Sequence, residues 1–353
     1  MPDAEAEEVA AVNGPNLKQQ QLFDHALECL DAMQISEACR AFHLAEQAGY
    51  DPDACAGGRW TCHALTGDLE AAWKESDAIA QRGKPDPHRF WDGQPLDDRH
   101  VLVRCLHGLG DTLQYIRYAP LIREEAASLT IEAQPLLKSL LQESGVADSV
   151  ITWGDREPYW DQQVEIVELP HIFRTTVDSI PSSIPYIRVP SVKSSPLEAR
   201  PRPIRVGLVW ASGAFNPLRS LPLAVLADLF ELAGFSFFSF QAGAEGAQAL
   251  PWARRMENQY QEGQSVLQTA VRLKTMDLLI TVDTMMAHLA GAMGINVWTL
   301  LPFACDWRWM MHREDSPWYP TMRLFRQPRA GDWLSVARRV GKALQDYSPG
   351  STK

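Results

Sequence analysis

The feature that most constrains this chain is an alternation of short apolar runs and helical patterns that occurs twice. In each alternation, apolar runs that read as strands are followed by turns and then by stretches with helical periodicity. Such alternation predicts parallel strands, because parallel neighbours need a crossover connection that is usually a helix. A proline-rich stretch over 181–203 separates the two alternations and predicts a linker. Two α/β domains in tandem are therefore expected.

The individual elements follow from the same patterns. The first alternation predicts strands over 100–106, 129–132 and 149–151, with helices over 112–125 and 135–143. The second predicts strands over 204–210, 235–241, 277–282 and 296–301, with helices over 222–232, 288–293 and 333–346 and a further helix through Ala270 and Leu273. Both domains are thus expected to be Rossmann-like, with their loops at the carboxyl ends of the strands free to bind ligands.

The region before the first alternation is predicted to be helical. Apolar residues recur at helical spacing between Leu17 and Arg82, and breaks in the pattern divide this stretch into four helices. Asp51 and Asp68 stand where helices would begin and are expected N-caps. The two helical hairpins resemble tetratricopeptide repeats, whose unit is about 34 residues. Because such arrays need about three or more repeats for stability, we expect a short cap docked onto the rest of the chain.

These patterns together predict the domain boundaries. They comprise an acidic, disordered tail over 1–16, a tetratricopeptide-like helical cap over 17–83, an N-terminal Rossmann-like domain over 84–190, a linker over 191–203, a C-terminal Rossmann-like domain over 204–347 and a tail over 348–353. A length of 353 residues is sufficient for two such cores and a helical appendage.

The net charge and the cysteine content of the chain indicate which partners it can bind and in which compartment it is expected. A formal net charge of −11 argues against nucleic-acid binding, which needs clustered Lys and Arg, but leaves a single nucleotide possible. No apolar stretch is long enough to predict a transmembrane helix, and the acidic N-terminus does not read as a secretory signal. The six cysteines form no C-x-x-C pair and predict free thiols in a reducing cytoplasm. A cytoplasmic protein is expected.

The first loop that could carry chemistry is the glycine turn His107–Thr112, which follows the strand over 100–106. Gly108 and Gly110 allow a tight turn and close approach of a ligand, and the next helix presents free N–H groups. Asp111 stands at the start of that helix. It is either an N-cap or a carboxylate that faces a ligand, and the residues alone leave both readings open.

Two further loops follow strands of the second alternation. The loop 211–220 is small and flexible and ends with Arg219, a cation that could neutralise a diphosphate. The segment 281–292 delivers polar side chains at the end of a buried strand, where an aspartate could accept hydrogen bonds from sugar hydroxyls and N–H groups could bind phosphate. The alternatives are an ordinary solvated arginine and a buried core histidine at position 288. The residues predicted to contact the ligand are Ser212, Gly213, Asn216, Asp283, Thr284 and His288.

Read together, these loops resemble a known family. The G-L-G-D turn, the G-L-V-W-A-S-G strand, the D-T-x-x-A-H-L-A-G-A-x-G helix start and the run L-P-F-A-C-D-W-R-W are similar to bacterial tetratricopeptide-containing glycosyltransferases. Those are related to lipopolysaccharide heptosyltransferases and, more distantly, to protein O-linked N-acetylglucosamine transferases. The resemblance covers about residues 90–345.

The resemblance implies a GT-B fold, in which two Rossmann-like domains face a cleft, and an inverting reaction without a catalytic metal. It implies that Asp111 is the general base and that Arg219 meets the leaving diphosphate. It places the nucleotide-sugar donor on the C-terminal domain and adds Asp306 and Arg308 as residues near the nucleotide, although core packing explains the neighbouring tryptophans equally well. The implied acceptor is a protein, a glycan or a lipid-linked molecule, and the helical cap could bind a protein partner.

Two departures from the family pattern keep a second hypothesis open. Met285 stands where many relatives have a small residue, and the loop 211–220 is short. The alternative is a catalytically degenerate GT-B protein that acts as a binding module through its helical cap. A nicotinamide-dependent oxidoreductase is disfavoured, because neither glycine turn has the three-glycine spacing of the dinucleotide fingerprint.

Overall fold

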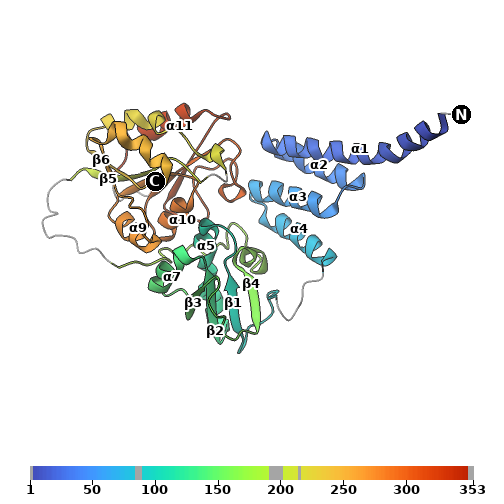
Figure 1. Ribbon diagram of the computed structural model, residues 1–353, viewed down its shortest axis with the longest axis horizontal. Helices are drawn as coiled ribbons and strands as arrows, with labels where there is room; N and C mark the ends of the chain where they lie inside the picture. The colour runs from blue at the N-terminus through green and yellow to red at the C-terminus, as the bar shows by residue number, and fades with distance from the viewer. Residues whose placement is uncertain (1–2, 84–89, 191–201, 214–215, 349–353) are drawn as a thin grey trace. The chain divides into compact units, whose positions relative to one another are not determined.

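The computed structural model describes residues 3–83, 90–190, 202–213 and 216–348 (Figure 1). Most of the predicted linker 191–203 and of the tail 348–353 therefore lies outside the described residues. The chain divides into two compact units. One contains the N-terminal helices with the segments 173–179 and 304–313, and the other contains both α/β halves.

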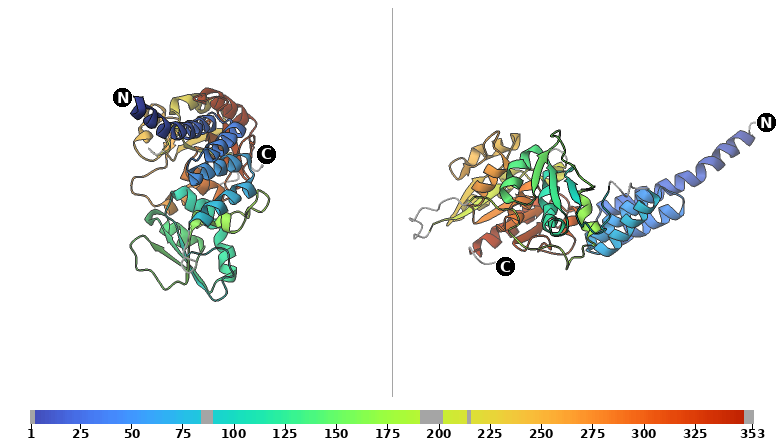
Figure 2. Two further views of the ribbon diagram at one scale, coloured as in Figure 1. Left: turned by 90° about the vertical axis from the view of Figure 1, so that its right-hand side faces the viewer. Right: turned by 90° about the horizontal axis from the view of Figure 1, so that it is seen from below.

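Four helices form the body of the helical unit, and each packs against the next (Figure 1 and Figure 2). They are α1 (Asp3–Asp31), α2 (Ile35–Gln47), α3 (Pro52–Thr66) and α4 (Leu69–Arg82). Both predicted N-caps are confirmed: the Asp51 carboxylate accepts from the N–H of Asp53 at 2.8 Å, and that of Asp68 accepts from the N–H of Ala71 at 3.0 Å. The prediction of a helical N-terminal region is confirmed, whereas its relation to tetratricopeptide repeats stays a prediction.

The structure differs from the sequence-based expectation at the N-terminus. Helix α1 begins at Asp3, so it includes most of the stretch 1–16 that was predicted to be disordered. The physical reason is composition, since the stretch is rich in Ala and Glu, which have high helix propensity even where no apolar stripe exists.

A second difference concerns the segment 304–313, which was assigned to the C-terminal domain and instead packs on the helices. The N–H of Met311 donates to the carbonyl of Leu65 at 2.7 Å, and the ring of Trp307 meets that of Trp60 edge-on at 5.0 Å. Trp307, Met310 and Met311 pack with apolar residues of the helices, so this segment completes the core of the helical unit.

The N-terminal α/β half is built on a four-stranded parallel sheet with the order β3-β2-β1-β4. Its strands are β1 (His100–Arg104), β2 (Ser128–Ala133), β3 (Ser149–Thr152) and β4 (Gln162–Glu165). Its helices are α5 (Leu109–Tyr115), η1 (Ile116–Tyr118), α6 (Ala119–Glu125), η2 (Pro135–Leu137), α7 (Lys138–Ser144), η3 (Ile166–Glu168) and α8 (Leu169–Ile172), where η marks a 3-10 helix. The helix predicted over 112–125 is thus divided, because Pro120 has no N–H to continue it and instead stands in the first turn of α6.

The C-terminal half is built on a six-stranded parallel sheet with the order β10-β9-β8-β5-β6-β7. Its strands are β5 (Ile204–Val209), β6 (Phe235–Ser239), β7 (Met256–Asn258), β8 (Leu278–Val282), β9 (Val297–Leu301) and β10 (Met322–Arg326). Its helices are η4 (Pro217–Arg219), η5 (Leu223–Glu231), η6 (Ala244–Trp252), α9 (Val266–Leu273), α10 (Met285–Ala292) and α11 (Trp333–Gln345); η7 (Trp307–Trp309) lies in the helical unit. Counted from β5, this is the strand order 3-2-1-4-5-6 of a doubly wound Rossmann sheet.

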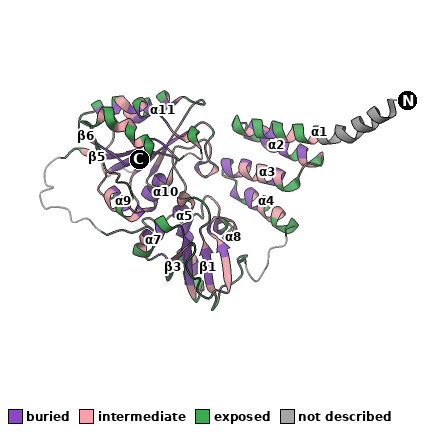
Figure 3. Cartoon of the chain, in the orientation of Figure 1, coloured by how far each residue is buried: buried purple, intermediate pink, exposed green. Residues whose placement is uncertain are grey.

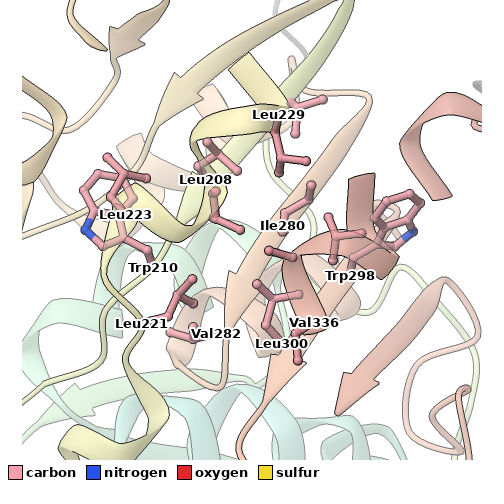
Figure 4. Close-up of a cluster of buried hydrophobic side chains, with 14 of the residues drawn as sticks. Leu208, Trp210, Leu221, Leu223, Leu229, Ile280, Val282, Trp298, Leu300 and Val336 are labelled. Carbon is pink, nitrogen blue, oxygen red and sulfur yellow. The ribbon is translucent and has the colours of Figure 1, made fainter. Parts of the chain in front are cut away.

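The prediction of an α/β chain with parallel sheets is confirmed. The core of the C-terminal half contains Leu208, Ile280 and Leu300 of adjacent strands, which pack with Leu229 of η5 and Val336 of α11 (Figure 4). The central strands are largely buried, and exposed residues gather on the outer faces of the helices (Figure 3). This buried sheet gives the loops at its carboxyl edge a rigid base.

Three edge or near-edge strands were missed in the sequence. They are β4, β7 and β10, and their sequences are Gln-Gln-Val-Glu, Met-Glu-Asn and Met-Arg-Leu-Phe-Arg. Polar residues interrupt each of them, because an edge strand is only partly covered and lacks the continuous apolar run of a central parallel strand.

Candidate functional site

A cavity of about 1060 Å³ opens at the carboxyl edge of the six-stranded sheet. The chain runs from β5 outward through β6 in one direction and returns to β8 on the other side of β5, so a topological switch point lies between β5 and β8. The loops that follow β5, β6 and β8 line the cavity. The lining residues with polar side chains are Ser212, Asn216, Arg219, Ser220, Gln241, Glu245, Gln248, Asp283 and Thr284. Position and volume are those of a small-molecule site.

The loop after β5 is fixed by Gln241, a residue that the sequence analysis did not select. Its side-chain oxygen accepts from the N–H groups of Trp210 and Ala211 at 3.0 and 2.9 Å. Its amide nitrogen donates to the carbonyls of Ala211 and Ala242 at 3.2 and 3.0 Å. The oxygen and the nitrogen of this buried amide each make two hydrogen bonds, and these hold the loop after β5 against the loop after β6. The signal that could have identified it is its position, since a polar Gln directly follows the phenylalanine-rich stretch 235–240.

Ser212 and Asn216, both predicted to bind ligand, shape the same loop. The Ser212 hydroxyl donates to the carbonyl of Asn216 at 2.9 Å, and the N–H of Ser212 donates to the hydroxyl of Ser220 at 3.0 Å. The Asn216 side chain accepts from the N–H of Leu218 at 3.1 Å and caps η4. Gly213 lies between them on the cavity wall. The loop is thus closed on itself and presents Arg219 at its end.

Arg219 and Asp283 belong to the loops after β5 and β8 and meet at the cavity. The Nε of Arg219 lies 3.4 Å from a carboxylate oxygen of Asp283, whose side chain is 2% exposed. The buried carboxylate orients the guanidinium and offsets part of its charge. A ligand in the cavity would therefore meet a cation whose orientation is set by a buried carboxylate.

Thr284 begins helix α10 beside this ion pair. Its hydroxyl accepts from the N–H of Met286 at 3.2 Å and lies 3.3 Å from the hydroxyl of Thr281. Met285 also lines the cavity. The positive end of the α10 dipole and the N–H groups of its first turn thus border the cavity at a point where an anion is favoured.

His288 does not line the cavity. It is buried on α10, and its Nδ1 lies 2.9 Å from the hydroxyl of Tyr319. On the other side it reaches the glycine turn of the N-terminal half, where a Cβ built on Gly110 would lie 2.8 Å from its Cδ2. Helices α5 and α10 are accordingly neighbours (Figure 1). The absence of a side chain at Gly110 therefore lets His288 of the other half pack closely against it, whereas the sequence analysis had expected a ligand to approach there.

We expect the substitution Gly110→Ala to lower the free energy of unfolding by about 1–3 kcal/mol, because the added methyl group overpacks the contact with His288. Urea titration followed by tryptophan fluorescence measures the change. Gly213→Ala is the matched control, since a Cβ at Gly213 meets no atom within 4 Å. Equal stability of the two variants would contradict this account of the α5–α10 contact.

Asp111 lies next to this contact, in the first turn of α5. Its Oδ2 accepts from the N–H of Gly108 at 3.0 Å, which closes the helix start as a capping interaction. The carboxylate is half-buried. Capping and a role toward a ligand are compatible, because a carboxylate has two oxygens and several acceptor sites.

A second carboxyl group near Asp111 was missed in the sequence. Glu165 ends β4, and its carboxylate lies 2.9 Å from Nε2 of His107. Burial raises the pKa of Glu165, the pairing with His107 lowers it, and the neighbouring charges of Glu168 and Asp111 raise it further. The net result is that the pKa of Glu165 lies above its ordinary value. Because β4 was not predicted, nothing in the sequence placed this residue beside the glycine turn.

Asp306 and Arg308 are not among the residues that line the cavity. Asp306 caps η7 and Arg308 lies within it, in the helical unit, where the Asp306 carboxylate accepts from the N–H of Arg308 at 3.1 Å and lies 3.2 Å from its Nε. Their side chains stabilise the turn that packs on α3. A role for either residue toward a nucleotide stays a prediction.

Within the part of the chain that the structure describes, no group of three or more His, Cys, Asp or Glu side chains could hold a metal ion. No helix among the described residues is long and apolar enough to cross a membrane.

Comparison with known proteins yields distant relatives. No family model matches the chain. Protein FlbA of Caulobacter vibrioides is 25% identical over 325 residues, which are 80% of this chain and 53% of that protein, so the chain spans about half the length of this curated relative.

Among solved structures, a glycosyl transferase family 9 protein from Veillonella parvula aligns with a TM-score of 0.48 and 12% identity, over 73% of this chain and 94% of that one. The E. coli ADP-heptose lipopolysaccharide heptosyltransferase II aligns with a TM-score of 0.49 and 13% identity, over 70% and 98%. The E. coli heptosyltransferase WaaC with ADP aligns with a TM-score of 0.47 and 14% identity, over 70% and 97%. Similarity at this level is too distant to decide an activity.

Proposed function

We propose that this chain is a glycosyltransferase that binds a nucleotide-sugar donor in the cavity of its C-terminal half. The observation that carries the proposal is the ion pair of Arg219 and Asp283 beside the start of α10, at the switch point of a Rossmann sheet. A cation, a helix N-terminus and a carboxylate together suit a diphosphate joined to a polyhydroxylated group. The motifs of the loops, which resemble those of heptosyltransferase-related enzymes, point the same way.

The role that we propose for each residue of the cavity follows from the chemistry of its side chain. Arg219 and the N–H groups around Thr284 bind the diphosphate and stabilise the charge that develops when it leaves. The carboxylate of Asp283 accepts hydrogen bonds from sugar hydroxyls. Because these groups supply positive charge without an ion, the reaction is proposed to need no metal. It is proposed to be inverting, with an acceptor hydroxyl attacking the anomeric carbon in one step.

Asp111 is the proposed general base. It removes the proton from the acceptor hydroxyl as the bond to the anomeric carbon forms and the bond to the diphosphate breaks. Its position supports this role, since the adjacent Gly110 packs against α10, the helix whose first turn lines the donor cavity. The base would thus stand on one half and the donor on the other, as two facing Rossmann-like domains require.

Two features favour a different function. Met285 has a long side chain and lines the cavity, and Asp283 offsets part of the charge of Arg219. A chain in which these features exclude the donor would be a binding module without turnover. Nucleotide binding separates the two functions.

We expect ADP, GDP or UDP to raise the melting temperature of the full chain in the presence of EDTA, since a ligand at 100 times its Kd stabilises by about 2.7 kcal/mol. Differential scanning fluorimetry with each nucleotide measures the shift. Arg219→Met should remove most of it. Arg329→Met is the matched control, because that arginine is largely exposed beside Asp332. Absence of a shift with every nucleoside diphosphate would favour the binding module, and a shift only with Mg²⁺ would contradict metal independence.

A further inference from the structure

A second cavity, of about 280 Å³, lies between the edge of the six-stranded sheet and helix α11. Its walls come from β9, from the edge strand β10, and from α11 with the residues that follow that helix. Among the described residues, none lines both this cavity and the donor cavity. A ligand bound here would therefore occupy a site of its own.

Aromatic side chains form the floor of this second cavity. Trp298 of β9 and Phe325 of β10 belong to the hydrophobic core of the C-terminal half, and their ring centroids lie 5.2 Å apart (Figure 4 shows Trp298 at the margin of this core). The ring of Tyr347 meets that of Trp298 edge-on at 5.6 Å. The Tyr347 hydroxyl is fixed as well, because it donates to the carbonyl of Asp277 at 2.9 Å and accepts from the side-chain amide of Asn296 at 3.0 Å. The floor is thus apolar and held in place by the core.

Three cations line the walls around this floor. Arg323 stands beside Trp298 in the register of β10 and β9, so both side chains lie on the same side of the sheet. The guanidinium carbon of Arg323 lies 4.9 Å from the ring centroid of Phe325. Arg339 and Lys342 lie three residues apart on α11 and hence on one side of that helix. Positive charge therefore reaches the cavity from both the sheet and the helix.

The balance of charges in the cavity decides which kind of anion it suits. Two carboxylates also line it: that of Glu314, which lies 3.2 Å from the guanidinium of Arg323, and that of Asp346, which follows α11. The guanidinium of Arg339 donates to the backbone carbonyl of Arg326, which is an uncharged partner. Three cations against two carboxylates leave one positive charge in excess, on a chain whose formal net charge is −11. One excess charge suits a monoanion such as a carboxylate better than it suits a phosphate dianion.

We infer that this cavity is a second ligand site and that it takes a small aromatic carboxylate with a single ring. An apolar cavity of about 150 Å³ can hold benzene, so about 280 Å³ leaves room for one ring and its carboxylate but not for a nucleotide sugar. The ring packs on Trp298 and Phe325, and the carboxylate accepts charge-assisted hydrogen bonds from Arg339 and Lys342. This site goes beyond the proposed transferase activity and does not depend on it.

The test titrates the full chain with para-fluorophenylacetate and follows the bound fraction by fluorine NMR. We expect saturable binding, about tenfold weaker binding for Lys342→Met, and no binding for Ala343→Leu, whose larger side chain would fill the cavity. Arg338→Met is the matched control, since it removes a cation from an exposed position of the same helix that does not line the cavity. Its Kd should equal that of the parent. Circular dichroism shows whether each variant is folded, and the exposed position of Lys342 keeps the test valid if Ala343→Leu does not fold.

Competitors separate the contributions of the ring, the charge and the position of the site. Unlabelled phenylacetate should displace the probe, whereas benzyl alcohol, inorganic phosphate and ADP at the same concentration should not. Equal displacement by benzyl alcohol would refute the role of the cations, and equal displacement by phosphate would refute that of the aromatic floor. Displacement by ADP would mean that the probe binds in the donor cavity, which contradicts the inference. The inference also fails if the probe does not bind the parent chain, or if Lys342→Met and Arg338→Met bind it equally well.

Discussion

The variant Asp111→Asn is expected to lose about 10²–10⁴-fold in the rate of sugar transfer while it binds nucleotide as the parent does. Asparagine keeps a side-chain oxygen that can accept from the N–H of Gly108, so the start of α5 stays capped. What it loses is the ability to take a proton from the acceptor. The measurement is initial-rate transfer from the nucleotide sugar that gives the largest melting shift.

The matched control for this variant is Asp228→Asn, which removes the charge of an exposed aspartate on η5. It should transfer sugar at the parental rate. Full activity of Asp111→Asn would remove that residue from the mechanism, and the carboxyl of Glu165 would then be the next candidate on the same edge. A lower melting temperature of Asp111→Asn would instead show that capping is its main role.

The variant Arg117→Met is expected to lower the free energy of unfolding by about 3 kcal/mol or more, because it leaves buried carbonyls without donors. Arg117 is 3% exposed, and its guanidinium donates to the carbonyls of Trp318 and Pro181 at 2.6 and 3.2 Å and to the hydroxyl of Tyr186 at 2.9 Å. It also lies 4.7 Å from the ring centroid of Tyr319. These partners lie far along the chain, so the residue ties the two α/β halves together.

Urea denaturation followed by circular dichroism measures this loss. Arg123→Met is the matched control, because Arg123 lies on α6 with a 40% exposed side chain and pairs with Asp148 at the surface. Such an exposed pair contributes about 0–1 kcal/mol. If both variants unfold at the same urea concentration, Arg117 is not the hub that its contacts indicate.

Local patterns in the sequence were sufficient for much of the architecture. The strands β1, β5, β8 and β9 consist mainly of apolar residues because most of their positions are buried, so they could be predicted as strands. The caps at Asp51 and Asp68 were predictable because a cap bonds to residues two or three positions away. Two of the three loops that line the cavity, those after β5 and β8, were selected for the same reason, since each directly follows a strand of mainly apolar residues.

The residues that were missed owe their roles to distant partners. Gln241 joins two loops about 30 residues apart, and Glu165 meets His107 only because β4 pairs with β1. Neither pairing leaves a periodic trace in the sequence. The segment 304–313 was assigned to the C-terminal half instead of the helical unit for a similar reason. Its tryptophans could pack in the core of either, and their partner Trp60 is far away in the sequence.

The sequence by itself determined seven of the ten strands that the structure describes, where the glycine turn and the two polar loops fall, and that two α/β halves follow a helical region. These properties depend on the residue types and their spacing along the chain, so they can be predicted from secondary-structure propensity and hydrophobic periodicity. Only the tertiary structure decided that Arg219 pairs with the buried Asp283, that His288 packs against Gly110, and that Glu165 pairs with His107. Those arrangements depend on strand order, and strand order is fixed by packing between residues that the sequence keeps far apart.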